Sequence, residues 1–265
     1  MLNNLQENEI QPRDNSAFYA TTPRMDVSKR YKIITTENAV EFFRQRGFYI
    51  SGYTEAGAFL AKNKGKSRHM VRLRPIGIEV KGYSPEIIIS NSHNTYTSLK
   101  INIGIYRYAC ANGLILGDTF FQEKVTHTGQ GMKEELTRIL NHVNHKFKEV
   151  DELITVMKNT EILYPQAVQF IEEASKIRLY GAKNEPFLSD MNKAVNVSPI
   201  RGADFGSDLW SVFNIVQEKI IKGGFEYSYK KNEEIKTRTT APIKNLVQLE
   251  NFNKELFDLA YGMVS

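Results

Sequence analysis

Residues 85–113 read PEIIISNSHNTYTSLKINIGIYRYACANG. Isoleucine, threonine and tyrosine dominate two runs of this stretch, and such β-branched and aromatic residues favour strands. Polar residues 91–94 separate the runs, and the second run is followed by Asn112-Gly113, a pair typical of a tight turn with positive φ. The stretch therefore predicts antiparallel strands that are joined by turns.

The same strand character extends outward over residues 70–125. Turn signals interrupt it, for example at Pro75 and Gly82, as expected between neighbouring antiparallel strands. Upstream, the order strand, helix, strand is predicted, with Thr36 as the helix N-cap and Gly47 as its stop. The predicted segments are strands over 31–35 and 48–53 and a helix over 37–44.

Beyond residue 129 apolar residues recur at intervals of three and four, which indicates helices. Ser207 or Asp208 is expected to cap the third of these helices, and Gly223 to end it. A sheet-rich half that is followed by a helical half predicts an α+β fold, with an antiparallel sheet in the N-terminal half covered on one face by helices from the C-terminal half. The predicted helices span 136–157, 165–177, 206–221 and 244–261.

Composition and charge describe the class of protein. The chain has 265 residues, 41% hydrophobic and 25% charged, with a formal net charge of +5, so it has enough apolar material for a core and favours anionic partners. Polar residues 1–28 are predicted to form a flexible or docking arm. Residues 29–265 are predicted to form one α+β domain, sheet-rich over 29–128 and helical over 129–265.

Several classes of protein receive no support from the sequence. No apolar run approaches the ~20 residues that span a bilayer, and no signal-peptide pattern opens the chain, so we expect a cytoplasmic protein without a membrane partner. Cys110 is the single cysteine, which excludes an internal disulfide. Gly65-Lys66-Ser67 ends like a phosphate-binding loop, but Leu60 stands where that loop needs its first glycine.

Histidines are the candidates for metal binding or catalysis. His142 and His145 are spaced for one face of a helix, although solvated helix histidines explain them equally well. His69, His93 and His127 lie in or near the predicted sheet, but no partnered triad accompanies them. We therefore assign no catalytic residue, no metal ligand and no cofactor, and an enzyme is the third interpretation.

A basic stretch is more informative. Residues 62–81 contain seven cations against one acid, Glu79, a formal charge of +6. Arg72 and Arg74 are spaced to share one strand face, and a lysine loop leading into such a strand suits a phosphate backbone. A solvated loop and a charged edge strand are the alternative. The predicted phosphate contacts are Lys62, Lys64, Lys66, Arg68, Arg72 and Arg74.

Aromatic residues extend this hypothesis. Tyr96, Tyr106 and Tyr108 lie in the same predicted sheet, and any base can stack on tyrosine, although tyrosines are also ordinary sheet residues. Arg107 has the parity of Ile105. It therefore either points into the helical layer, paired with an acid such as Glu218, or joins the binding face with Tyr106 and Tyr108.

The opening stretch, with the later GSDLWSVFNIVQEKI, resembles the phage/plasmid-like protein family of unknown function (domain of unknown function 932). The features that carry the resemblance are Asn91-Ser92, Arg107, Cys110 and Asn112-Gly113, followed downstream by a tryptophan helix with Asn214. The resemblance covers about residues 70–222. It implies a mobile-element protein in a bacterial host, with no assigned activity.

Together these observations predict a sequence-tolerant protein that binds single-stranded DNA or RNA. It would belong to a phage or plasmid, act in recombination or strand annealing, and form a homo-oligomer. The alternative is a protein-interaction factor that inhibits a host defence or modifies a host machine, with a host protein as its partner.

Overall fold

A computed structural model defines two compact units, residues 1–148 and 149–265. The structure describes residues 9–14, 16–22, 33–56, 65–77, 82–93, 98–107, 112–116, 121–125, 131–179, 206–224, 226–231 and 234–264. No helix in these ranges is both long enough and apolar enough to cross a bilayer.

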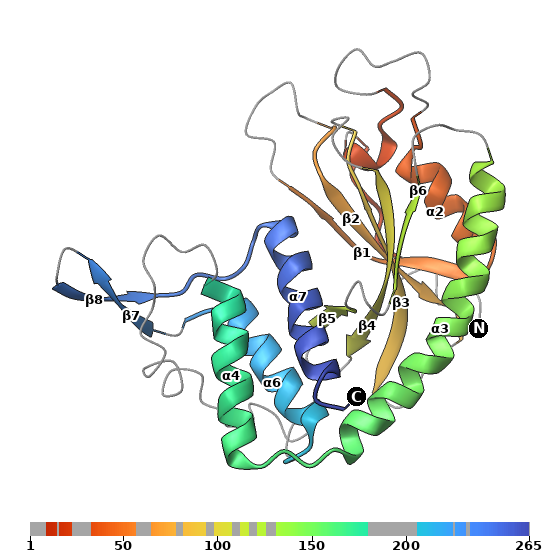
Figure 1. Cartoon of the computed structure of the whole chain (residues 1–265). Helices are drawn as coiled ribbons and strands as arrows, with labels where there is room; N and C mark the ends of the chain where they lie inside the picture. Colours follow the sequence, from red (N-terminus) through yellow and green to blue (C-terminus); the bar gives the residue numbers. More distant parts are fainter. Residues whose placement is uncertain are drawn as a thin grey trace. The chain divides into compact units, whose positions relative to one another are not determined.

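Within its described residues, the first unit contains a short 3-10 helix, one α-helix, six strands and the first part of a long helix (Figure 1). In chain order these are η1 (Ala17–Tyr19), α2 (Thr36–Arg44), β1 (Phe48–Glu55), β2 (His69–Pro75), β3 (Tyr83–Asn91), β4 (Leu99–Arg107), β5 (Asn112–Ile115), β6 (Gln122–Val125) and α3 (Met132–Asn159). The second unit begins within α3 and continues with α4 (Tyr164–Leu179), α6 (Leu209–Lys222), β7 (Glu226–Lys231), β8 (Glu234–Thr239) and α7 (Leu246–Tyr261).

Antiparallel pairing builds the sheet of the first unit in the order β1-β2-β3-β4-β5. β6 pairs with the other half of the same β4 edge, so that β4 holds β5 at one end and β6 at the other. The predicted α+β class and antiparallel sheet are confirmed.

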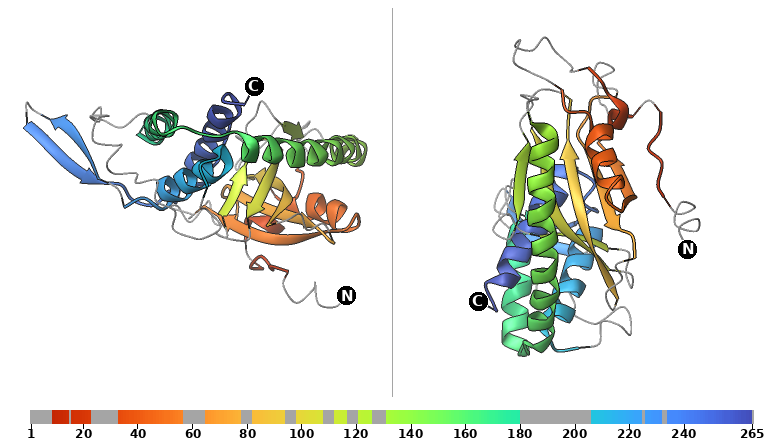
Figure 2. Two further views of the ribbon diagram at one scale, coloured as in Figure 1. Left: turned by 90° about the horizontal axis from the view of Figure 1, so that it is seen from below. Right: turned by 90° about the vertical axis from the view of Figure 1, so that its right-hand side faces the viewer.

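One face of this sheet is apolar and lies against helices. Its buried side chains include Val71, Leu73, Ile87, Ile89, Ile101 and Ile103. The start of α3 lies on this side, since Arg138 pairs with Glu123 of β6 at 3.0 Å. Helix α2 lies on it too, because the hydroxyl of Thr36 is 2.7 Å from the ring of His69 in β2. Figure 2 shows both helices against the sheet.

Three local expectations are wrong. The N-cap of α2 is Thr35, whose side chain accepts a hydrogen bond from the Asn38 amide, so the helix begins at Thr36. Residues 33–35 form no strand, and the rest of the predicted strand over 31–35 lies outside the described residues. Asn112 and Gly113 belong to β5 and pair with β4, which places the β4–β5 connection at residues 108–111, ahead of the predicted turn.

Part of the predicted N-terminal arm contributes to the core. Phe18 is buried and its ring packs edge-on against Tyr53. Glu9 accepts hydrogen bonds from the Arg44 guanidinium at 2.8 Å and from the Ile50 amide at 3.0 Å. Ser16, Ala17 and Phe18 are buried while Ile10 is exposed, so only part of the predicted arm joins the core.

The second unit is a helical group from which a two-stranded ribbon extends (Figure 1). Asp208 caps α6 by accepting from the Ser211 amide, and Gly223 ends it with φ +69°, as the sequence predicts. Helices are confirmed over all four predicted segments. The β7–β8 ribbon was not predicted.

Candidate nucleic-acid interface

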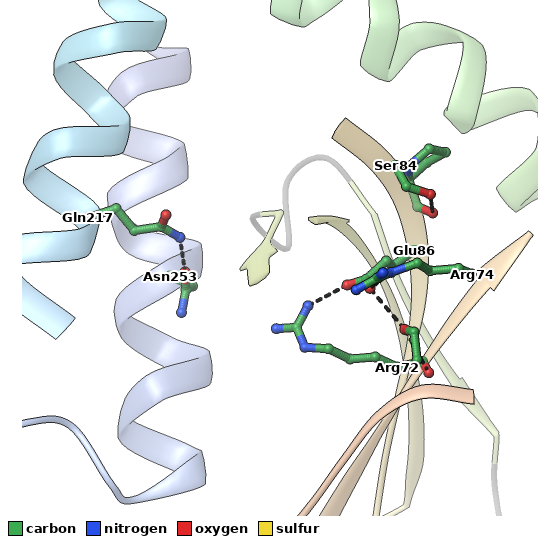
Figure 3. Close-up of polar contacts among 8 residues, drawn as sticks. Arg72, Arg74, Ser84, Glu86, Gln217 and Asn253 are labelled. Atoms are coloured by element: carbon green, nitrogen blue, oxygen red, sulfur yellow. Dashed lines mark hydrogen bonds and ion pairs between the residues drawn. The ribbon is translucent and has the colours of Figure 1, made fainter. Parts of the chain in front are cut away.

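The second face of the sheet carries both apolar and polar side chains. Met70, Ile88 and Ile115 form a buried apolar cluster on it, and β3 also places a buried glutamate there. Glu86 of β3 has no exposed surface, and its carboxylate accepts from Arg72 Nη1 at 2.6 Å and from Arg74 Nε at 2.8 Å (Figure 3). Ser51 donates a third hydrogen bond, at 3.0 Å. The prediction that Arg72 and Arg74 share one strand face is confirmed, and both arginines contact an acid that the sequence analysis did not identify.

The contacts with Glu86 affect the titration of Arg74. Burial opposes the charged form of Arg74, but the hydrogen bond and the charge of Glu86 outweigh burial and raise the pKa of Arg74 above its ordinary value. Two guanidiniums around one carboxylate leave this cluster with a net positive charge. A buried carboxylate in turn requires such partners, because desolvation without them is costly.

Tyr106 of β4 lies beside this cluster. The Arg74 guanidinium carbon is 3.4 Å from the centre of the Tyr106 ring, a cation–π contact. One side of the half-buried ring is therefore occupied by arginine. A nucleic-acid base could stack only on the other side of Tyr106.

Two lysines lie on the same face at the β4–β6 edge. Lys100 and Lys124 are directly opposite each other in the register, and Lys124 is exposed. Like charges in this position destabilise a sheet unless an anion offsets them. With Arg72 and Arg74 they make four cations against Glu86, the one acid on this face among the described strand residues, for a formal charge of +3. We call Arg72, Arg74, Lys100, Lys124 and Glu86 the basic sheet face.

Two amides complete this face. Asn102 is fully buried, and its side-chain oxygen and nitrogen have no hydrogen-bond partner in the described part of the chain. Gln122 lies opposite Asn102 in the register, and its Oε1 atom also lacks a partner there. Buried amides without partners mark places where a water molecule or a ligand supplies the missing hydrogen bonds.

The other predicted site residues lie elsewhere. Arg107 is 8% exposed and pairs with Tyr83 on the helix-covered face, so it does not join Tyr106 on the basic sheet face. Lys66 and Arg68 are half-buried and directly precede β2. Lys62, Lys64, Tyr96 and Tyr108 lie outside the described residues.

A second polar cluster surrounds His69 on the helix-covered face. The Ser67 carbonyl can only accept, so His69 Nδ1 donates to it at 2.9 Å, and Nε2 therefore accepts from the Thr36 hydroxyl at 2.7 Å. Asn91 donates to the same hydroxyl at 3.0 Å. Burial lowers the pKa of His69, which favours the neutral ring.

The His69 cluster has the connections of a base beside a hydroxyl, but it is closed to solvent. Thr36 and His69 have no exposed surface, so a substrate cannot reach the hydroxyl. The rings of His69 and His93 lie 5.5 Å apart, and His93 is equally buried. The cluster therefore joins α2 to the sheet, and it is not a catalytic site. His127 lies outside the described residues.

The helix histidines do not gather further ligands. His142 Nδ1 is 3.3 Å from Glu123 Oε1, and Arg138 binds the same carboxylate. Within the ranges that the structure describes, no three side chains among His, Cys, Asp and Glu are placed to hold a metal ion.

The second unit has a buried polar pair of its own. Gln217 of α6 donates to Asn253 of α7 at 2.6 Å, and Figure 3 shows the two amides between their helices. Asn253 donates in turn to the Leu249 carbonyl at 2.8 Å. Both amides are buried, so this pair sets how α6 and α7 align.

Comparison with known proteins identifies a family whose function is unknown. A family model described as a domain of unknown function, DUF932, matches residues 25–249. Two proteins of Escherichia coli K12, named UPF0380 protein YfjQ and UPF0380 protein YafZ, are each 28% identical over 238 residues, covering 90% of this chain and 84% of the relative. No solved structure gives a significant match.

Proposed function

The chain belongs to the DUF932 family, and we propose that it binds single-stranded nucleic acid through the basic sheet face, as a homo-oligomeric recombination or strand-annealing factor of a phage or plasmid in the bacterial cytoplasm. The observation that carries the proposal is the register. It brings two arginines and two lysines from three strands to one face, with a single acid among the described strand residues there.

Charge on this face suits a phosphate backbone. Each lysine or arginine that neutralises a phosphate releases condensed counterions, which gives binding without sequence preference. Lys100 and Lys124 lie directly opposite each other, so one phosphate could contact both. Arg72 and Arg74 add positive potential while Glu86 holds their positions.

Stacking would supply a part of the binding free energy that salt does not screen. The outer side of the Tyr106 ring is the candidate platform, because Arg74 occupies the other side. Base stacking on an aromatic side chain contributes about 1–3 kcal/mol and tolerates every base. A protein that uses both phosphate contacts and base stacking keeps part of its affinity at high salt.

A charge-matched pair of variants tests the proposal. Lys100→Gln/Lys124→Gln removes two cations from the basic sheet face, and Lys133→Gln/Lys158→Gln removes two exposed cations from α3. The affinity for labelled oligothymidine would be measured by fluorescence anisotropy from about 50 to 200 mM salt, the range over which phosphate contacts weaken strongly. Circular dichroism would establish that both variants fold.

The salt dependence of binding should change in the sheet variant and not in the α3 control. The slope of log affinity against log salt should fall by about 0.7 for each lost contact on a single strand, and only in Lys100→Gln/Lys124→Gln. Equal slopes in the parent and both variants would overturn the proposal. Absence of binding by the parent at low salt would favour a protein partner instead.

A further inference from the structure

The β7–β8 ribbon extends from the helices of the second unit. Among the strands that the structure describes, β7 and β8 pair only with each other, from Glu226 opposite Thr239 to Lys231 opposite Glu234. Every residue of β8 is exposed. Figures 1 and 2 show the ribbon extending away from α4, α6 and α7. An isolated two-stranded ribbon is only marginally stable, so a contribution to the stability of the fold does not explain the ribbon.

The root of the ribbon is fixed firmly. Gly223 and Gly224 have positive φ, and a Cβ atom on Gly223 would lie 2.7 Å from the Ala241 backbone. The Gly224 amide donates to the Thr240 carbonyl, and Arg178 Nη2 of α4 donates to the Ala241 carbonyl, both at 2.8 Å. The ribbon is thus an arm with a defined root.

One face of the arm combines aromatic and cationic side chains. Tyr227 lies opposite Arg238, and Tyr229 lies opposite Lys236. The two tyrosine rings are 6.0 Å apart, while Lys236 and Arg238 are exposed. At the root, Arg178 interacts electrostatically with Tyr227. Cations therefore follow the tyrosines from the root along the arm.

Arg178 of α4 adds a cation at the root of the arm. Burial lowers its pKa, and its Nε atom has no hydrogen-bond partner in the described residues. It lines a hollow of about 500 Å³ together with the amide side chains of Asn245, Gln248 and Asn251 and with one acid, Glu255. An anion beside Arg178 would offset its lost hydration.

The described strand residues of the arm hold four cations, Lys230, Lys231, Lys236 and Arg238, against two acids, Glu226 and Glu234. Glu234 lies 3.3 Å from Lys236, with the two side chains 73% and 45% exposed, and an exposed pair of this kind is held weakly. The cations also disfavour a protein strand as the partner. Lysine and arginine on an edge strand are a common means of blocking strand addition, whereas the same charges attract phosphates.

We propose that the β7–β8 ribbon is a binding arm for double-stranded nucleic acid. The ribbon enters the major groove, while Lys236 and Arg238 contact the flanking phosphates. A two-stranded ribbon has the width that this groove admits. This proposal adds a second binding site to the single-strand site proposed on the sheet, and it does not depend on that site. A protein that brings single strands together would hold its duplex product here.

The test compares one duplex and one single strand of the same sequence. Lys236→Gln/Arg238→Gln removes two exposed cations from the arm, and Lys133→Gln/Lys158→Gln is the matched control on α3. The full-length protein would be titrated into each labelled oligonucleotide over a salt series. Exposed positions on the arm should leave folding intact, which circular dichroism and a thermal melt would establish.

The arm variant should lower duplex affinity, and its duplex salt slope should fall by about 0.9 for each lost contact, with single-strand affinity and the control unchanged. Unchanged duplex binding would overturn the proposal. An equal loss on both oligonucleotides would overturn the assignment to duplex. Absence of duplex binding by the parent, together with a sedimentation change in the arm variant, would make the ribbon a protein contact. Single-strand binding by the parent decides the sheet proposal separately.

Discussion

The Nη1 atom of Arg72 lies 2.6 Å from the Oε2 atom of Glu86, whose side chain has no exposed surface. Arg74 approaches the second carboxylate oxygen at 2.8 Å. Breaking a buried pair leaves the other charge uncompensated. The cluster therefore serves first to hold β2 against β3, and its net positive charge is a consequence of having two arginines.

Glu86→Ala should destabilise the first unit strongly. It leaves two partly buried guanidiniums without their acid, and removing one partner of a buried pair costs about 3–5 kcal/mol. The free energy of unfolding from a denaturant titration measures this loss. Glu123→Gln is the control, because its partner Arg138 is 57% exposed and Glu123 itself keeps 20% of its side-chain surface exposed. Similar losses in the two variants would show that Glu86 has no special structural role.

His69 should make stability depend on pH. Its folded pKa lies below the ordinary 6.5 because burial disfavours the charged ring. At pH above 6.5 the ring is neutral in both states and has no effect. As the pH falls below 6.5 the unfolded chain takes up a proton that the folded protein resists, so the free energy of unfolding falls, by at most about 1.4 kcal/mol per pH unit.

The measurement is the free energy of unfolding at a series of pH values from neutral down to the onset of carboxylate titration. His69→Gln should show a flatter dependence over that window than the parent. A parent curve that is flat below pH 6.5 would show that His69 is protonated as readily in the folded state as in the unfolded one.

Gly104 allows β4 to lie close to its neighbours. A Cβ atom there would meet the Ile88 side chain and lie 2.7 Å from the Leu114 carbonyl oxygen. Gly104→Ala should therefore cost about 1–3 kcal/mol, as overpacking usually does. Adding Ile88→Val should recover only part of the loss, because the Leu114 carbonyl belongs to the backbone. Thermal melts of both variants decide this, and a Gly104→Ala protein as stable as the parent would contradict the close packing.

The core elements could be predicted because their signals are local. Three consecutive isoleucines mark β3, isoleucines at every second position mark β4, and apolar residues recur at helical spacing along α3. The β7–β8 ribbon could not be found this way. Both of its faces carry polar residues, so no apolar alternation marks the strands, and Tyr227 and Tyr229 were not recognised as a strand face.

The candidate site was only partly visible for a different reason. Alternation placed Arg72 and Arg74 on one face, but Glu86 joins them through the β2–β3 register, which spacing alone does not fix. Lys100 and Lys124 were missed because β6 pairs with β4 and not with β5, the strand before it. When two strands are adjacent in the sheet but not consecutive in the sequence, contacts between their residues can be predicted only once the sheet topology is known.

Protection of individual lysines by bound single-stranded DNA tests the central claim most directly. The folded protein would be acetylated briefly with and without oligothymidine, and the modification of each lysine measured by mass spectrometry. The account predicts that DNA slows modification of Lys100 and Lys124, that high salt reverses the effect, and that Lys133 and Lys158 are unaffected. Equal modification of Lys100 and Lys124 with and without bound DNA would contradict it.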